Sequence, residues 1–471
     1  MNAKTNDNLK CEDFKNQINE FIEKNEKNII LDLQQLIKIP SVKSEKENNA
    51  PFGKNSAEVL IKACEIAKNC GLKTNNLENY IGYGDLIGED STPYLGILTH
   101  LDIVPEGSGW IKNPFSGEVE NGLVFGRGAI DDKGPTISVI YALKAINSLK
   151  IPLKKTVRLI MGCDEETGSG DDIEKYKQNE KMPPLVFTPD ADFPVINGEK
   201  GMLKVFFEEN SFKDVIYIKG GEVINAVASL CVAKVMNTDV KTVYEIAKLL
   251  NLDEFIEAEN DDNTVKITVR GVNSHASTPQ EGINANTIMF KLLANLKISE
   301  SSTFKKLSSA FEFGDNFGES LGISSSDEIS GKLTSVLSML SLENELLEGK
   351  IDIRFPVTKT KVEICNLIEK AFKNKRIHLL KISGTEPHYT NEKSEFVQTL
   401  LKTYSLHTSK DAYCISIGGG TYVHDIDGGV AFGVAVKGEN NHMHGADEFI
   451  SIEALKDNAK LFAKAIINIC G

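Results

Sequence analysis

The first third of the chain alternates short continuous apolar runs with segments of helical periodicity. The apolar runs are residues 94–104, 156–166 and 185–194, and the helical patterns cover 18–38, 56–70 and 135–149. Continuous apolar runs are typical of strands that are buried on both faces. Strands that alternate with helices favour a largely parallel sheet, so we expect an α/β layer here.

The pattern changes after about residue 200 and returns after about residue 385. Residues 265–271 and 350–357 alternate apolar and polar positions, as half-exposed strands do, and helical patterns follow at 285–296 and 361–373. The stretch 301–341 is rich in Ser, Gly and acidic residues, which is typical of a loop-heavy segment or part of a lid. Beyond it we expect a helix at 393–405, strands at 412–417 and 429–436, and a closing amphipathic helix.

These patterns predict an α/β domain that is interrupted by an insert. We expect the first domain to comprise residues 1–198 and 386–471, with a mixed, largely parallel sheet flanked by helices. Residues 199–385 would form an inserted α+β lid domain. The length of 471 residues supports more than one domain, because it exceeds what a single hydrophobic core usually serves.

Composition excludes several classes of partner. The formal net charge of −14 argues against binding to nucleic acid or to anionic membranes, since both favour a basic surface. A run of about 18 apolar residues, as a membrane span needs, does not occur. The eight cysteines are scattered, which favours reduced thiols over a disulfide framework. Because residues 1–15 hold no apolar stretch of signal-peptide type, we expect a cytoplasmic protein.

Acidic and histidine residues follow most of the apolar runs. Taken alone, each group fits a surface acid, a strand-end histidine or a helix cap. Together they fit a ligand-binding edge, because ligands bind at the carboxyl ends of strands in open α/β sheets. Nitrogen and carboxylate oxygen donors suit zinc, or manganese. The groups are His100 with Asp102, Asp131 with Asp132, Glu165 with Glu166, Asp190, and His442 with His444.

Five motifs carry a resemblance to a known family. HLD, GRGAIDDKGP, MGCDEETGS, TPDADFP and HMHGADE stand in this order along nearly the whole chain. In order and approximate spacing they resemble the metallohydrolase family of aminoacylase, acetylornithine deacetylase, succinyl-diaminopimelate desuccinylase, glutamate carboxypeptidase and carnosinase-type dipeptidases. GVNSHAS, GKLT, IDIRFP and SGTEPHYT, with the length of the insert, look most like the bacterial V-type dipeptidases.

The resemblance implies two divalent metal ions, most readily Zn²⁺ with Mn²⁺ as the alternative, and a hydroxide that bridges them. Asp131 is preferred over Asp132 as the bridging ligand because the family pattern reads D-x-K-G, and His444 is preferred over His442 by its spacing to a following acidic pair. Two ions with three carboxylates and one hydroxide sum to zero charge, which suits burial. The implied ligands are His100 and Asp190 for one ion, Glu166 and His444 for the other, and Asp131 for both.

The remaining roles also come from the resemblance. Glu165 would be the general base and later the proton donor, and Asp102 would orient His100. In the insert, His275 would reach the oxyanion of the tetrahedral intermediate. Arg354 would clamp a substrate carboxylate, with a strand-surface ion pair as its alternative.

Asn225 and Gly419 complete the implied substrate contacts. Asn225 resembles a lid asparagine, and Gly419 lies in a glycine triplet that can present backbone amides to a carboxylate. One departure stands out, because His424 takes the place at which the family commonly has an arginine after that triplet.

We therefore expect hydrolysis of dipeptides that have a free amino end. An N-acyl-amino-acid deacylase of the same family is the alternative, since its metal ligands would look identical. A non-catalytic binding protein is a remote one, because it would tolerate loss of Glu165 or Asp131 and both are present. The V-type dipeptidases resemble dimeric relatives whose second lid lies within the same chain, so the resemblance also implies a functional monomer.

Overall fold

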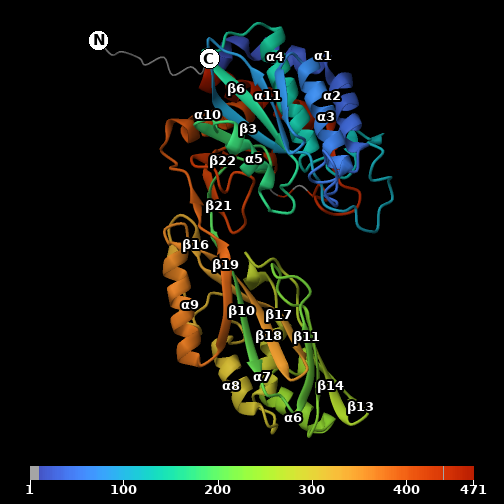
Figure 1. Ribbon diagram of the computed structural model, residues 1–471, viewed down its shortest axis with the longest axis vertical. Coiled ribbons are helices and arrows are strands. Elements are labelled where there is room, and N and C mark those ends of the chain that lie inside the picture. The colour runs from blue at the N-terminus through green and yellow to red at the C-terminus, as the bar shows by residue number, and fades with distance from the viewer. Residues whose placement is uncertain (1–9, 437, 439) are drawn as a thin grey trace, which may run out of the picture. The chain divides into compact units, whose positions relative to one another are not determined.

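The computed structural model describes residues 10–471 apart from 437 and 439. The chain forms two compact units (Figure 1). The first comprises Met1–Asn197, Thr390–Ile415 and Thr421–Gly471, and the second comprises Gly198–Tyr389 and Ser416–Gly420.

The first unit has a mixed sheet with a parallel centre. The strand order is β1-β2-β6-β3-β7-β22-β9-β20, and β21 also pairs with β9. The four central strands β6, β3, β7 and β22 run parallel, which confirms the predicted fold class. The strands are β1 (Lys73–Leu77), β2 (Ile81–Leu86), β3 (Asp90–His100), β6 (Lys155–Gly162), β7 (Leu185–Thr188), β9 (Val195–Glu199), β20 (His388–Tyr389), β21 (Cys414–Ile417) and β22 (Gly429–Ala431).

Helices cover both faces of this sheet, as its apolar composition requires. Ile97 and Leu98 are neighbours in β3 and therefore point to opposite faces. Ile97 packs in the large core with α4 and α11, whereas Leu98 packs in a smaller core with α5. The helices are α1 (Lys15–Lys24), α2 (Glu26–Ile37), α3 (Lys54–Asn69), α4 (Lys133–Ser148), α5 (Asp171–Asn179), α10 (Glu395–Thr408) and α11 (Ile452–Cys470).

Short strands complete the first unit. One small sheet joins β4 (Val119–Glu120), β5 (Leu123–Phe125) and β24 (Phe449–Ser451). Another pairs β8 (Ala191–Asp192) with β23 (Val434–Ala435). The first of these sheets links the segment before α4 to the segment before α11.

Three expectations for the first unit need correction. The strand expected at 429–436 is two strands, β22 and β23, which belong to different sheets. The helical pattern at 18–38 forms two helices, α1 and α2, which are separated at Asn25. The apolar run at 94–104 is a strand only as far as His100. Asp102 therefore lies in the loop after β3. The direction of its side chain does not follow from the alternation of side chains along the strand.

The second unit is an eight-stranded antiparallel sheet with helices and a separate core. The strand order is β13-β14-β12-β11-β17-β18-β10-β19. Its core consists mainly of aliphatic residues and of phenylalanine rings in contact with one another. The strands are β10 (Gly201–Asn210), β11 (Val215–Gly220), β12 (Leu230–Val235), β13 (Ile256–Asp261), β14 (Thr264–Arg270), β17 (Thr334–Glu343), β18 (Leu346–Phe355) and β19 (His378–Thr385); the helices are α6 (Val240–Leu249), α7 (Ala285–Leu293), α8 (Ser301–Ala310) and α9 (Lys361–Lys375).

The segment 301–341 is more regular than its composition predicts. It contains α8, the short strands β15 (Ser326–Asp327) and β16 (Gly331–Lys332), and most of β17. β17 lies inside the sheet between β11 and β18. Its alternate positions are buried, so the expectation of a loop-heavy segment was wrong for this part.

Two further expectations concern the whole chain. Within the described part of the chain, every helix is too short or too polar to cross a membrane. The eight cysteines are free thiols, as expected from their scattered positions.

Candidate metal centre

Acidic or histidine side chains follow three neighbouring parallel strands of the first unit. β3 ends on His100, while Glu165 and Glu166 come just after β6 and Asp190 just after β7. The carboxyl ends of parallel strands share one edge of a sheet, which is where open α/β sheets bind ligands. The fold therefore brings these four side chains to one place.

Asp131 joins the two histidines of this edge. It lies in the turn before α4, and its Oδ1 is 2.9 Å from His100 Nε2. Its Oδ2 is 2.8 Å from His444 Nε2, in the loop before β24. Asp190 lies 3.5 Å from His100 Nε2, and Glu166 lies 3.4 Å from His444 Nε2. One carboxylate thus stands between two similar half-sites.

The donor atoms lie close enough to hold cations. The atoms of His100, Glu165 and Asp190 lie within 4.8 Å of one another, and so do those of Asp131, Glu166 and His444. Imidazole nitrogen and carboxylate oxygen are the donors of zinc sites with open positions. The distances alone group Glu165 with the ligands, so its separate role as base rests on the resemblance.

The charges of the edge attract positive charge. Burial raises the pKa of the Glu165 carboxyl well above its ordinary value. Burial and the charge of Asp131 raise the pKa of Asp190. In spite of its burial, hydrogen bonds from the two histidines hold the pKa of Asp131 below its ordinary range. Hydrogen bonds to Asp131 and Glu166 raise the pKa of His444 to about 10.

Asp102 contacts both His100 and the turn that carries the two glutamates. His100 Nδ1 lies 3.1 Å from the Asp102 carbonyl oxygen and 3.5 Å from its carboxylate. The same carboxylate accepts the N–H groups of Glu165 and Glu166 at 3.3 and 3.0 Å. Asp102 can therefore orient the imidazole from the loop, and it also holds the glutamate turn.

Asp132 and His442, which the family pattern does not select as ligands, have other hydrogen-bond partners. Asp132 is buried and accepts the backbone N–H of His100 at 3.1 Å. The His442 ring nitrogen Nδ1 lies 3.0 Å from the carbonyl oxygen of Ala446. Asp131 and His444 are the members of each pair that reach the cluster.

The insert residues that the resemblance implies lie in the second unit. The segments of Asn225 and His275 are joined by a bridge between Ala226 and His275. The N–H of Ser277 donates to His275 Nδ1, which leaves the proton of the neutral ring on Nε2. Burial and the charge of Arg354 lower the pKa of His275, which favours that neutral form. His275 can therefore donate a hydrogen bond through Nε2.

Arg354 is already paired inside the second unit. Its Nε and Nη2 donate to Asp352 at 2.6 and 2.8 Å, and its Nη1 donates to the carbonyl oxygen of Gly418 at 3.0 Å. Two nitrogens of the guanidinium are thus bound to Asp352, which agrees with the alternative of an ion pair on the strand surface. Gly419 follows in the same loop, and the space around its α-carbon is open.

A buried ion pair that sequence reasoning missed links two of the motifs. Arg127 pairs with Glu448, and it also donates to the carbonyl oxygen of His444 at 3.1 Å. Glu448 in turn accepts the N–H of Ile130 at 3.0 Å. The pair therefore connects the Asp131 turn to the His444 loop. Its signal was the presence of opposite charges inside GRGAIDD and HGADE.

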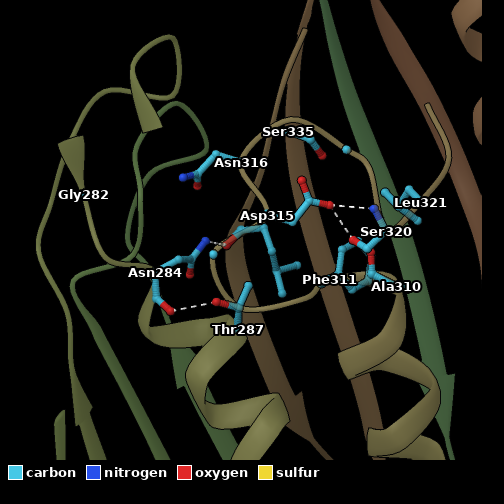
Figure 2. Close-up of a pocket in the computed structure, with 13 residues that line it drawn as sticks. Gly282, Asn284, Thr287, Ala310, Phe311, Asp315, Asn316, Ser320, Leu321 and Ser335 are labelled. Atoms are coloured by element: carbon cyan, nitrogen blue, oxygen red, sulfur yellow. Dashed lines mark hydrogen bonds between the residues drawn. The ribbon is translucent and has the colours of Figure 1, made fainter. Parts of the chain in front are cut away.

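A separate small cavity in the second unit does not share this chemistry. Figure 2 shows it between the start of α7 and the loop after α8, with a volume of about 40 Å³. That is room for a few water molecules. Its one carboxylate, Asp315, already accepts the N–H and hydroxyl of Ser320 at 2.7 and 2.6 Å.

Comparison with known sequences identifies relatives over nearly the whole length of the chain. The model of peptidase family M20/M25/M40 matches residues 96–468. "Putative dipeptidase YtjP" of Bacillus subtilis is 34% identical over 463 residues, which cover 96% of this chain and 98% of that protein. A "Putative dipeptidase" of Staphylococcus epidermidis is 30% identical, with 94% and 97% covered.

Solved structures share the fold at lower identity. Human carnosine dipeptidase 1 superposes with a TM-score of 0.58 at 13% identity, covering 97% of this chain and 98% of that one. The dipeptidase Dug1p of Saccharomyces cerevisiae gives a TM-score of 0.57 at 13% identity, with 96% and 98% covered.

Proposed function

This chain belongs to peptidase family M20/M25/M40, and we propose that it hydrolyses the peptide bond of dipeptides with the help of two divalent metal ions. The names of its relatives in Bacillus subtilis and Staphylococcus epidermidis support a dipeptide substrate. The same names favour a dipeptidase over the N-acyl-amino-acid deacylase that the motifs also allow.

The position of Asp131 between two histidines is the observation that carries the proposal. Each of its carboxylate oxygens lies less than 3 Å from one imidazole, at 2.9 and 2.8 Å. Each half-site adds one further carboxylate, from Asp190 or from Glu166. One ion would bind to His100 and Asp190 and the other to Glu166 and His444, with Asp131 shared. The donor set fits Zn²⁺, with Mn²⁺ as the second choice.

The residues around the ions would then share the chemistry. When bound, the ions would polarise the scissile carbonyl group and lower the pKa of the attacking water. Glu165 would take a proton from that water and pass it to the leaving amine. Burial raises the pKa of the Glu165 carboxyl, and a carboxylate with a higher pKa is a stronger proton acceptor. Asp102 would keep His100 oriented.

The second unit would act as the lid and supply contacts to the substrate. His275 would donate from Nε2 to the oxyanion, and Gly419 and Asn225 would contact the ends of the dipeptide. Arg354 would hold the loop that carries Gly419 through its hydrogen bond to the carbonyl oxygen of Gly418. It would bind a substrate carboxylate only if its guanidinium bound that carboxylate and Asp352 at the same time.

A monomer would be sufficient for this activity. The implied lid residues His275, Asn225 and Arg354 belong to the same chain as the proposed ligands, which supports the proposal. Light scattering coupled to size exclusion checks it, with the mass of one chain, 51.8 kDa, as the expected result. A stable dimer would contradict it.

A substrate panel tests the proposed function. Purified protein loaded with Zn²⁺ or Mn²⁺ is assayed against dipeptides, N-acetyl amino acids and N-succinyl amino acids, with metal content measured in the same samples. We expect turnover of dipeptides at two bound ions per chain. Cleavage of the acylated amino acids alone would identify a deacylase, and a protein that binds no divalent ion and cleaves nothing would be a binding protein.

A further inference from the structure

The turn 163–166 after β6 carries the proposed base and one proposed ligand, and two buried carboxylates bind its backbone. Asp172 Oδ2 accepts the first two N–H groups of the turn, at 2.8 and 3.0 Å. Asp102 accepts the last two, at 3.3 and 3.0 Å. Four consecutive amides are thus held by two side chains. Asp102 already has a role beside His100, whereas Asp172 has none in the proposed reaction.

Tyr422 binds the same oxygen of Asp172 from a distant part of the chain. Its hydroxyl donates to Asp172 Oδ2, and both side chains are buried. The ring of Tyr422 also meets the His100 ring edge to face, with centroids 6.1 Å apart and planes at 88°. Tyr422 therefore contacts a proposed ligand directly and reaches the glutamate turn through Asp172.

The end of β6 is shaped to receive this pair. A Cβ atom on Gly162 would overlap the hydroxyl of Tyr422 and would also approach Asp172 Oδ2. Any larger residue at position 162 would thus displace the pair. The glycine, the aspartate and the tyrosine are fitted to one another directly before the turn.

We infer that Asp172 and Tyr422 are positioning residues that fix the turn presenting Glu165 and Glu166, an inference that rests on the proposed function for what these glutamates do. Three donors converge on one carboxylate oxygen, and charge-assisted hydrogen bonds are roughly twice as strong as neutral ones. Loss of the tyrosine hydroxyl frees that oxygen to move. A displacement of about 1 Å in a reacting group can cost roughly 100-fold in rate.

A pair of tyrosine variants tests the inference. Tyr422→Phe removes the hydroxyl and keeps the ring. Tyr176→Phe is the matched control, because Tyr176 is also buried in the first unit and its hydroxyl accepts from Arg158 at 3.1 Å, away from the turn. We expect Tyr422→Phe to lower kcat by about 10-fold or more at saturating metal, with KM unchanged. The amides of 163–166 should exchange with deuterium faster. Tyr176→Phe should keep the wild-type kcat and exchange.

A second variant, Asp172→Asn, tests the same inference independently of Tyr422→Phe. Asp172→Asn keeps the shape and loses the charge, and we expect a larger fall in kcat and faster exchange of the same amides. Wild-type kcat and exchange in both Tyr422→Phe and Asp172→Asn would overturn the inference. If the wild-type protein cleaves no dipeptide, the proposed function fails, and the exchange of 163–166 still decides whether the pair holds the turn.

Discussion

Asp131 binds one imidazole with each of its carboxylate oxygens, and its neighbour Asp132 binds a backbone amide instead. The sequence could indicate which of the two reaches the cluster, because Lys133 and Gly134 set the register of the motif. It could not indicate Asp172. An aspartate in the first turn of a helix is typical of a residue that stabilises the helix dipole, and only the fold turns it toward the glutamate turn.

A prediction at the level of single residues concerns Glu165. Replacement by Gln removes the proton-accepting oxygen and keeps the size of the side chain. We expect kcat to fall by about 10²- to 10⁴-fold, which is the range of general acid–base catalysis. Bound metal should stay at the wild-type level. Turnover is measured with a dipeptide, and metal is measured by elemental analysis.

An active Glu165→Gln variant would refute the role of Glu165 as base. A variant that is inactive and also lacks one ion would instead place Glu165 among the ligands, as its distance to His100 and Asp190 allows. Glu166→Gln is the matched comparison, since it should lose metal affinity.

At the scale of elements, the sequence predicted those with strong local signals. α9 begins at Lys361, and its N-cap Thr360 forms a capping box with Glu363, which the Thr-x-x-Glu pattern of the sequence indicates. β17 was missed because Ser335, Ser338 and Ser341 interrupt its apolar positions and resemble a loop. Its place between β11 and β18 depends on pairing with segments that are distant in sequence, and local composition does not report such pairing.

The core of the second unit gives a prediction for Gly349 in β18. A Cβ atom at this position would overlap the ring of Phe207, which stacks on Phe311 at a centroid distance of 5.3 Å. We expect Gly349→Ala to lower the free energy of unfolding by about 1–3 kcal/mol, as overpacking of a core does. Urea denaturation followed by circular dichroism measures it. Glu348→Ala, at the exposed neighbouring position, should stay within about 0.5 kcal/mol of the wild type. Equal stability of the two variants would contradict the overlap.

At the scale of the whole molecule, the proposed metal ligands and the implied substrate contacts lie on different units. The ligands His100, Asp131, Glu166, Asp190 and His444 belong to the first unit, and His275, Asn225 and Arg354 belong to the second. Each unit has its own hydrophobic core. The proposed ligand set comes from the resemblance of the motifs to a known family, and the fold brings these residues close together. The pairing of Arg354 with Asp352 agrees with the ion-pair alternative from the sequence, since residues two apart in a strand lie on the same side.

This division predicts that metal removal destabilises one unit and spares the other. An ion that binds only the folded state at 100 times its Kd stabilises that state by about 2.7 kcal/mol. For a unit of this size we expect chelation to lower the melting temperature of the first unit by roughly 5 °C or more. Without cations, the partly buried carboxylates of Asp190 and Glu166 would face Asp131 with less compensation of their negative charge. Calorimetry with and without a chelator measures the shift, and the transition of the second unit should not move. A Glu166→Gln variant should show a smaller shift, because it has lost one ligand. Equal shifts of both transitions would mean that the ions also stabilise the second unit, which would contradict a ligand set confined to the first.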